Sequence, residues 1–263
     1  MDGIINWTQI RQTMLLATHR IEFYNPSYWD KQANAVNENM AQMAPLTRKQ
    51  LKKLPLSSEY TFLDVGAGTG RMTIPIAKRA KHVTALEPSE NMLALLKANA
   101  TKQHIINIHY VNKSLEELDE VKAYDFVVAS FSLFMFDIQK VLKMDAIASR
   151  GVYLFLSASP WMDEEMQNVV YGNSSACSDF IFVFNILHDA GILANVEFCT
   201  YDLKQSYDNL EDALSRFKQT YRILPEKEDK LREHLRANLV EEKGKLWWNR
   251  KRKAAMIWWT TNK

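Results

Sequence analysis

Residues 61–71 read "TFLDVGAGTGR", an apolar run followed by glycines at every second position, 66, 68 and 70. The run has the composition of a buried strand, and the spacing of the apolar residues after it predicts a helix. Glycine tolerates positive φ angles and leaves backbone N–H groups uncovered. This strand–turn–helix therefore predicts that a ligand approaches the main chain at contact distance, in the way that nucleotides do.

The spacing of the glycines distinguishes between nucleotide-like ligands. The dinucleotide fingerprint G-x-G-x-x-G requires a glycine three positions after Gly68, where this chain has Arg71. A nicotinamide cofactor is therefore disfavoured. Asp64 is badly placed for a pyrophosphate but well placed for a cationic ligand group. Glu87, at the expected end of the next strand, can accept hydrogen bonds from both hydroxyls of a ribose.

Beyond this segment, short apolar runs rich in Val, Ile and Phe alternate with segments of helical period. This alternation predicts an α/β fold with a doubly wound, Rossmann-like and mostly parallel seven-stranded sheet, an antiparallel last strand and an N-terminal helical cap. We expect residues 1–58 to form the cap and residues 59–263 the ligand-binding domain, as one compact unit overall. The expected strands are 61–65, 83–87, 106–111, 124–130, 151–157, 192–203 and 254–261, and the expected helices are 72–80, 89–100, 138–149, a helix from Ser159, 179–191 and two charged helices over roughly 209–240.

Composition restricts the function only loosely. Lys and Arg (33) nearly balance Asp and Glu (31), so the net charge of +2 does not indicate a nucleic acid or an anionic membrane as partner. The two cysteines form no disulfide framework, and the first residues do not resemble a secretory signal, so we expect a cytoplasmic location. The longest apolar stretch, 126–136, is too short to span a bilayer. Nothing in the sequence predicts the oligomeric state.

Four motifs occur in an order typical of one enzyme family: "LDVGAGTGR" (63–71), "VTALEPSENML" (83–93), "NKSLEEL" (112–118) and "YDFVVASFSLFMF" (124–136). Together they resemble the class I S-adenosylmethionine-dependent methyltransferases over about residues 60–157, and "YWDKQA" (28–33) adds a weaker match upstream. The resemblance implies that S-adenosylmethionine is the cofactor and that the chain transfers a methyl group.

The resemblance also implies a role for each motif in binding this donor. The methionine part would be held by Asp64 and by the backbone of the glycine loop, and the ribose by Glu87. Ser130, which ends the fourth strand, would lie near the transferred methyl group. The full set of implied cofactor residues is Asp64, Gly66, Ala67, Gly68, Gly70, Glu87, Pro88, Met92, Ser114, Leu115, Glu116 and Ser130.

Several of these residues also have a purely structural interpretation. Ser114 and Glu117 form an S-x-x-E capping box, which is compatible with adenine contact at the same position. Met92 falls at helical spacing and fits a core position as well as a ligand contact. Glu87 differs, because an acid that ends an apolar strand beside a glycine loop is expected to face a ligand.

The methyl acceptor is less clearly indicated than the donor. Relatives that modify nucleic acid bases usually end the fourth strand with N/D-P-P-[YFW], whereas this chain has "ASFSLF", which favours a small molecule. Transfer from a sulfonium depends mainly on alignment, so a general base is needed only for an acceptor of high pKa. No catalytic residue is assigned. The candidate pocket residues, each with core packing as the alternative, are Tyr28, Trp29, Phe131, Phe134, Trp161 and Tyr171.

Two further patterns in the sequence bear on a metal site and on nucleic acid binding. The six histidines and two cysteines show no metal-ligand spacing, so no metal site is expected. "KGKLWWNRKRK" (243–253) has the basic and aromatic composition of a nucleic acid-binding patch, but a solvated hairpin turn before a final strand explains it better. Two alternatives to a small-molecule enzyme remain: an RNA methyltransferase, and a protein that binds S-adenosylmethionine or S-adenosylhomocysteine without catalysis.

Overall fold

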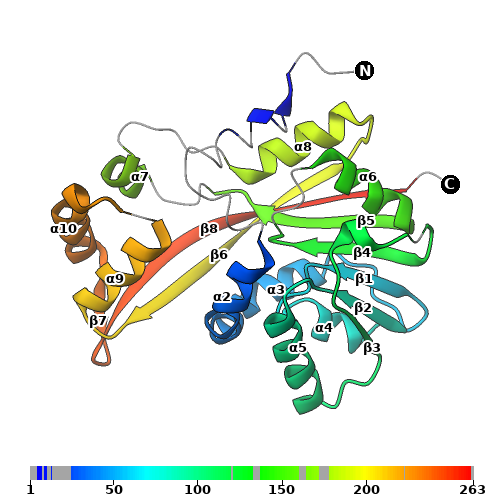
Figure 1. Ribbon diagram of the computed structural model, residues 1–263, viewed down its shortest axis with the longest axis horizontal. Coiled ribbons are helices and arrows are strands. Elements are labelled where there is room, and N and C mark those ends of the chain that lie inside the picture. Colours follow the sequence, from blue (N-terminus) through cyan, green and yellow to red (C-terminus); the bar gives the residue numbers. More distant parts are fainter. Residues whose placement is uncertain are drawn as a thin grey trace. The chain divides into compact units, whose positions relative to one another are not determined.

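The computed structural model describes residues 5–7, 9–10, 13, 25–119, 121–132, 137–159, 164–171, 178–221 and 223–261. Its sheet has the strand order β3-β2-β1-β4-β5-β8-β6, and the first five of these strands run parallel (Figure 1). The order reverses between β1 and β4, which makes the carboxyl ends of these two strands the switch point where open α/β sheets bind ligands. The parallel strands are β1 (Thr61–Val65), β2 (His82–Leu86), β3 (Ile108–Val111), β4 (Tyr124–Ser130) and β5 (Ala148–Ser157).

The remaining strands are β6 (Asn195–Tyr207), β7 (Val240–Glu242) and β8 (Lys245–Thr260). Strand β8 runs antiparallel to β5, because Thr261 donates its backbone N–H to Arg150 whereas Ala158 donates to Lys253. The short strand β7 pairs antiparallel with β8. The doubly wound sheet expected from the sequence is thus confirmed, with β7 as an eighth strand.

Some of the helices begin at a residue whose side chain caps them. Asn25 accepts a hydrogen bond from the backbone N–H of Ser27 at the start of α2, and Ser89 caps α5 in the same way through Met92. The helical segments are α2 (Pro26–Asn39), η2 (Met40–Met43), α3 (Ala44–Leu51), α4 (Thr73–Ala77), α5 (Glu90–Lys102), η3 (Leu115–Glu117), α6 (Ile138–Ile147), α7 (Glu164–Tyr171), α8 (Asp179–Asp189), α9 (Leu210–Tyr221), η5 (Pro225–Lys227) and α10 (Glu228–Asn238).

The chain divides into two compact units. Unit 1 comprises Met1–Leu156, Phe180–Cys199 and Ala255–Lys263, and unit 2 comprises Ser157–Asp179 and Thr200–Ala254. Each has its own apolar core, built on the sheet around Phe62 and Phe155 in unit 1, and around Phe217, Leu231 and Trp248 in unit 2. The expected division of the chain at residue 58 stays a prediction.

Several element boundaries differ from those expected. Strand β8 begins at Lys245 rather than at residue 254, because Arg250 and Arg252 alternate with exposed lysines and take inward-facing positions. Helix α4 has five residues instead of the nine expected. Ser159, the expected cap of a helix, accepts a hydrogen bond from the backbone N–H of Lys253 at 2.7 Å, and the expected first turn of that helix, residues 160–163, lies outside the described residues.

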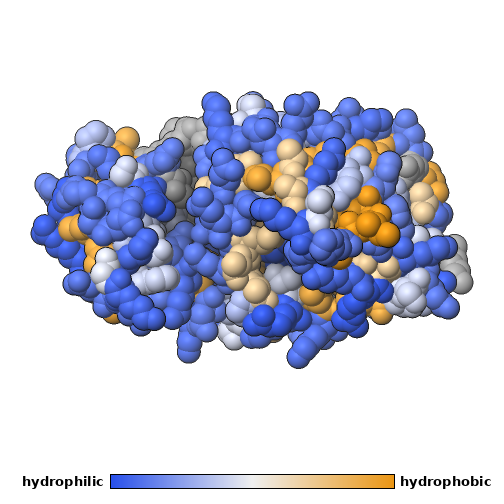
Figure 2. All heavy atoms as spheres, turned by 90° about the horizontal axis from the view of Figure 1, so that it is seen from below, coloured by the Kyte–Doolittle hydropathy of each residue, from blue (hydrophilic) through white to orange (hydrophobic). Residues whose placement is uncertain are grey.

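Figure 2 shows one face of the molecule, on which hydrophilic residues predominate and hydrophobic residues form separate patches between them. The most exposed large apolar side chains of the described residues, Ile106 and Leu193, lie in loops. None of the described helices has the length and apolar character needed to cross a membrane.

Candidate functional site

The glycine loop after β1 has the conformation that its sequence predicts. Gly66, Gly68 and Gly70 all have positive φ angles, of 71°, 55° and 99°. A Cβ atom on Gly70 would lie 3.0 Å from side-chain atoms of Ile74 and Leu96, so a side chain at this position would crowd the core. A Cβ on Gly68 would meet no atom of the described residues within 4 Å. The backbone at Gly68 therefore borders open space that a ligand can occupy, whereas the backbone at Gly70 packs against the core.

Two of the loop's N–H groups are used to hold the loop itself. The N–H groups of Gly66 and Ala67 both donate to the carbonyl oxygen of Leu86, at 2.8 and 3.1 Å. Leu86 is the last residue of β2, so these bonds fix the loop against the neighbouring strand. Gly66 and Ala67 can thus contribute shape to a binding site but do not direct these N–H groups at a ligand.

Glu87 directly follows β2 and is held beside the glycine loop. Its Oε2 atom accepts a hydrogen bond from the N–H of Gly68 at 2.8 Å, and its Oε1 atom accepts one from the N–H of Ser89 at 3.0 Å. Burial of this side chain, which is 7% exposed, raises the pKa of Glu87 despite these two bonds. Each carboxylate oxygen retains acceptor capacity. A fixed carboxylate beside the open space at Gly68 fits the two hydroxyls of a ribose.

Asp64 lies at the end of β1 and is 1% exposed. Its Oδ2 atom accepts a hydrogen bond from the hydroxyl of Thr73 at 2.6 Å. Burial raises the pKa of Asp64 to about 6, an effect that the bond from Thr73 and the charge of Arg71 partly oppose. Asp64 is thus close to half ionised near pH 6, and a cationic ligand group would favour its charged form.

Arg71, the residue after the third loop glycine, connects the loop to two other elements. Its Nη1 atom donates to Thr47 Oγ1 at 2.8 Å and to Gln50 Oε1 at 2.7 Å, both on α3. Its Nη2 atom donates to the hydroxyl of Ser130 at the end of β4. The sequence motifs did not predict this role for Arg71. Its position directly after the glycine loop could have indicated that its side chain lies near the site.

Helix α2 contacts the same edge through polar side chains. The Oδ1 atom of Asp30 accepts hydrogen bonds from the hydroxyl of Ser89 at 2.6 Å and from the N–H of Asn91 at 3.1 Å. Asn99 on α5 donates to Asn37 at 2.7 Å and to the carbonyl oxygen of Thr69 at 3.0 Å. Part of the predicted N-terminal cap thus packs on α5 and the glycine loop. Asp30 falls within the quoted motif "YWDKQA", but the motif gave no reason to select it.

The adenine-side candidates have mixed environments. Met92 is buried in α5, and Leu115 is buried in η3. Ser114 and Glu117 form the expected capping box, with the Ser114 N–H donating to Glu117 at 2.7 Å. Glu116 is exposed and pairs with Lys140. The carbonyl oxygen of Pro88 accepts a hydrogen bond from Asn112 at 3.0 Å. These contacts are structural, and the adenine role of the five predicted residues stays a prediction.

The acceptor-pocket candidates are only partly described. Tyr28 and Trp29 pack edge to face in α2, with ring centroids 5.2 Å apart. Phe131 follows β4 with a positive φ angle of 56°. Phe134 and Trp161 lie outside the described residues, and so does the side chain of Tyr171, the last residue of α7. Their predicted role as a pocket remains untested.

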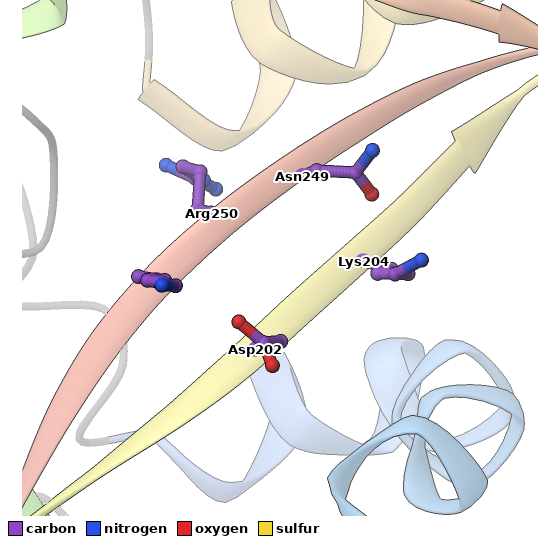
Figure 3. Close-up of a pocket in the computed structure, with 5 residues that line it drawn as sticks. Asp202, Lys204, Asn249 and Arg250 are labelled. Carbon is purple, nitrogen blue, oxygen red and sulfur yellow. The ribbon is translucent and has the colours of Figure 1, made fainter.

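A separate hollow of about 270 Å³ lies in unit 2 and contains none of the predicted cofactor residues. In Figure 3, Asp202 and Lys204 come from β6, and Asn249 and Arg250 from β8. Within the ranges that the structure describes, no three His, Cys, Asp or Glu side chains gather in a way that could hold a metal ion.

Comparison with known proteins and the fold both indicate a methyltransferase. Residues 62–149 match the family described as "Methyltransferase domain". An uncharacterized protein of Haemophilus influenzae is 26% identical over 98% of both chains. The 23S rRNA (uracil(1939)-C(5))-methyltransferase RlmD of Aliivibrio fischeri is 30% identical over 95 residues, which are 36% of this chain and 20% of that one.

Two solved structures share the fold at low sequence identity. A Bacillus halodurans protein has a TM-score of 0.56 at 15% identity, over 82% of this chain and 99% of that one. The precorrin-6y C5,15-methyltransferase of Geobacter metallireducens has a TM-score of 0.51 at 15% identity, over 82% and 86%.

The doubly wound sheet, the glycine loop and the domain match define the class of this protein as a methyltransferase of Rossmann-like fold. Residues 62–149 form a methyltransferase domain of the class I, S-adenosylmethionine-dependent kind. The resemblance found in the four motifs and the expected cofactor are thereby confirmed, while the role of each site residue remains to be tested.

Proposed function

We propose that this enzyme methylates a small molecule and that it holds the donor at the carboxyl ends of β1, β2 and β4. The main support for this donor site is the open space at Gly68, which lies beside the carboxylate of Glu87. Two backbone N–H groups hold that carboxylate in place. Glu87 would bind the ribose hydroxyls, Asp64 the ammonium group of the methionine part, and Ser130 would lie near the methyl group. When bound, S-adenosylmethionine supplies an electrophilic methyl group on a sulfonium centre.

The chain's own contribution to the reaction would be alignment. A loop tied to β2 by two backbone hydrogen bonds and a carboxylate fixed by two more are parts of a preorganised site. Holding donor and acceptor in line can lower a barrier by about 7–11 kcal/mol. No general base is assigned, and none is required for an acceptor that is already deprotonated at working pH.

A small-molecule acceptor is supported by the end of β4. This strand ends in Ser130 and is followed by Phe131 and Ser132, not by the Pro-Pro-aromatic sequence that base-modifying relatives use to hold an exocyclic amine. The hydroxyl of Ser132 donates to the carbonyl oxygen of Val65 at 3.1 Å, so the segment is tied to β1. We also propose that the protein is cytoplasmic, as its two cysteines led us to expect.

Calorimetric titration with S-adenosylhomocysteine tests the donor site. We expect binding by the wild-type protein, and an affinity about 10- to 100-fold lower in Glu87→Ala, because hydrogen bonds to a charged acceptor contribute about 1.5–3 kcal/mol. Glu90→Gln is the matched control, since Glu90 is exposed in the first turn of α5 and should bind as the wild type does. Unchanged binding in Glu87→Ala would contradict the proposed role of this residue.

RNA as the acceptor is the alternative that a specific feature favours. Lys245, Lys251 and Lys253 are exposed along β8, and one relative, matched over 95 residues, is an rRNA methyltransferase. Against it, Lys245 pairs with Asp208, and Lys243 and Gly244 form a two-residue hairpin turn with positive φ angles. If RNA is the acceptor, Lys251→Glu with Lys253→Glu should weaken RNA binding steeply and reduce its salt dependence.

An assay of labelled methyl transfer to a metabolite panel distinguishes two alternatives. Transfer to any compound shows an enzyme that acts on small molecules, and not a protein that only binds the donor. We expect transfer to at least one small molecule and none to total RNA. Transfer to RNA alone would replace the proposed acceptor class. Binding of S-adenosylhomocysteine without any transfer would favour the non-catalytic alternative.

A further inference from the structure

The guanidinium of Arg71 is fixed in position by neutral oxygen atoms of two separate elements. Thr47 and Gln50 on α3 are both buried, and their Oγ1 and Oε1 atoms accept hydrogen bonds from Nη1 of Arg71 at 2.8 and 2.7 Å. The hydroxyl of Ser130 accepts one from Nη2. A guanidinium cannot lose its proton in proteins, so these contacts hold a permanent positive charge at one place.

That place is the switch point of the sheet. Ser130 is the last residue of β4, and the residue before it, Ala129, is in register with Val65 at the end of β1. Arg71 itself follows the glycine loop that leaves β1. The charge of Arg71 also acts on Asp64, whose pKa it lowers against the larger effect of burial. The fixed charge therefore lies where the donor's methionine part and the acceptor are expected to meet.

Phe131, the next residue after β4, has an unusual backbone conformation at the same switch point. It has a φ angle of 56°, which is rare for a bulky residue, and its N–H donates to the carbonyl oxygen of Phe155 at 2.8 Å. Its ring centroid lies 5.4 Å from Cζ of Arg71, within the range of a cation–π contact. Residues held in such conformations by their surroundings cluster at functional sites.

We propose that Arg71 determines specificity for an acceptor whose reacting oxygen or sulfur atom is negatively charged. This inference rests on the proposed function and deepens it. A lone pair of the anionic acceptor forms the new bond to the methyl carbon, while the carbon–sulfur bond breaks and its electron pair stays on sulfur. Both charges disappear in this step, so no proton has to be removed. Repulsion between Arg71 and the sulfonium is also relieved as the transfer proceeds.

The charge of Arg71 can be tested without knowing the acceptor, because S-adenosylmethionine carries a sulfonium charge that S-adenosylhomocysteine lacks. Calorimetry should show that Arg71→Met raises the affinity for S-adenosylmethionine relative to S-adenosylhomocysteine by roughly three- to tenfold at low salt. Arg71→Lys keeps the charge and should keep the wild-type ratio. Gln50→Met removes one hydrogen bond to Arg71 without removing charge, so both affinities should change alike and leave the ratio unchanged.

A panel of phenols, thiols and amines then tests the acceptor class. We expect methyl transfer to phenols and thiols, with a rate that follows the deprotonated fraction of each as pH rises. Arg71→Met should raise KM for these acceptors more than it lowers kcat, and Arg71→Lys should restore it. An unchanged affinity ratio in Arg71→Met, or transfer to amines alone, would overturn the inference while the donor site stands. Failure of the wild type to bind S-adenosylhomocysteine would instead overturn the proposed function.

Discussion

The backbone N–H of Gly68 donates a hydrogen bond to the carboxylate of Glu87 at 2.8 Å, which joins the turn after β1 to the end of β2. The two residues that the donor is expected to contact therefore position each other. A backbone change at Gly68 should move Glu87, and loss of the carboxylate should leave the Gly68 N–H without this acceptor.

Alanine at Gly68 and at Gly70 should have different effects. A Cβ at Gly68 meets no atom of the described part of the chain within 4 Å but needs a positive φ angle, so we expect a loss of about 1–2 kcal/mol in the free energy of unfolding, together with loss of donor binding. A Cβ at Gly70 would lie 3.0 Å from Ile74 and Leu96, so overpacking should add about 1–3 kcal/mol to that loss. Urea denaturation and calorimetry measure both effects; equal losses of stability would contradict this reading of the loop.

Asp64 should make stability depend on pH. Its pKa of about 6 in the folded state lies above the ordinary value of 3.8, so the native state binds a proton between these values that the unfolded state does not. The stabilisation is complete below about pH 4 and is lost as pH rises through about 6, and it amounts to about 3 kcal/mol. Asp64→Asn cannot ionise and lacks this dependence. The difference in unfolding free energy between wild type and Asp64→Asn, measured from pH 4 to pH 8, should therefore change by this amount in favour of the variant.

The same variant reports on the proposed ammonium contact. If ionised Asp64 binds the ammonium group of the donor, the affinity of the wild type for S-adenosylhomocysteine should rise as pH increases through about 6. Asp64→Asn should bind with an affinity that is lower and independent of pH in this range. A parallel pH dependence in both proteins would show that another group is responsible.

Asp30 on α2 should stabilise the start of α5, although the two elements are far apart in sequence. Its carboxylate accepts the N–H of Asn91 at 3.1 Å and the hydroxyl of Ser89 at 2.6 Å. Asp30→Ala should lower the free energy of unfolding by about 1–2 kcal/mol, as the loss of a helix cap does, and speed hydrogen exchange at Asn91. Glu38→Ala is the control, since Glu38 is exposed on the same helix. Equal exchange at Asn91 in both variants would contradict the capping role.

Local patterns predicted the centre of the sheet well. Strand β1 has the expected bounds because five residues of strand composition meet a glycine turn, and β4 matches for a similar reason. The start of β8 was missed because Arg250 and Arg252 occupy inward positions where apolar residues are expected, so the alternation is hidden in a basic run.

The contacts made by Asp30 and Arg71 could not be predicted in the same way. Asp30 caps a helix through Ser89, 59 residues away in sequence, and Arg71 reaches Ser130 over the same separation. A single sequence records which residues can donate or accept hydrogen bonds but not which distant partners the fold brings together. The glycines and Glu87 were found because their roles depend on neighbours in the chain.

The division of the chain between the two units bears on how the protein is made. Strand β8 supplies Ala255 onward to unit 1 and the residues before it to unit 2, so unit 1 is complete only after the residues of unit 2 have been translated. The parallel strands must wait, with the sheet edge at β5 unpaired, until synthesis reaches residue 260. Unpaired strand edges favour aggregation. Nascent chains of this enzyme should therefore depend on chaperones until translation of this strand is finished.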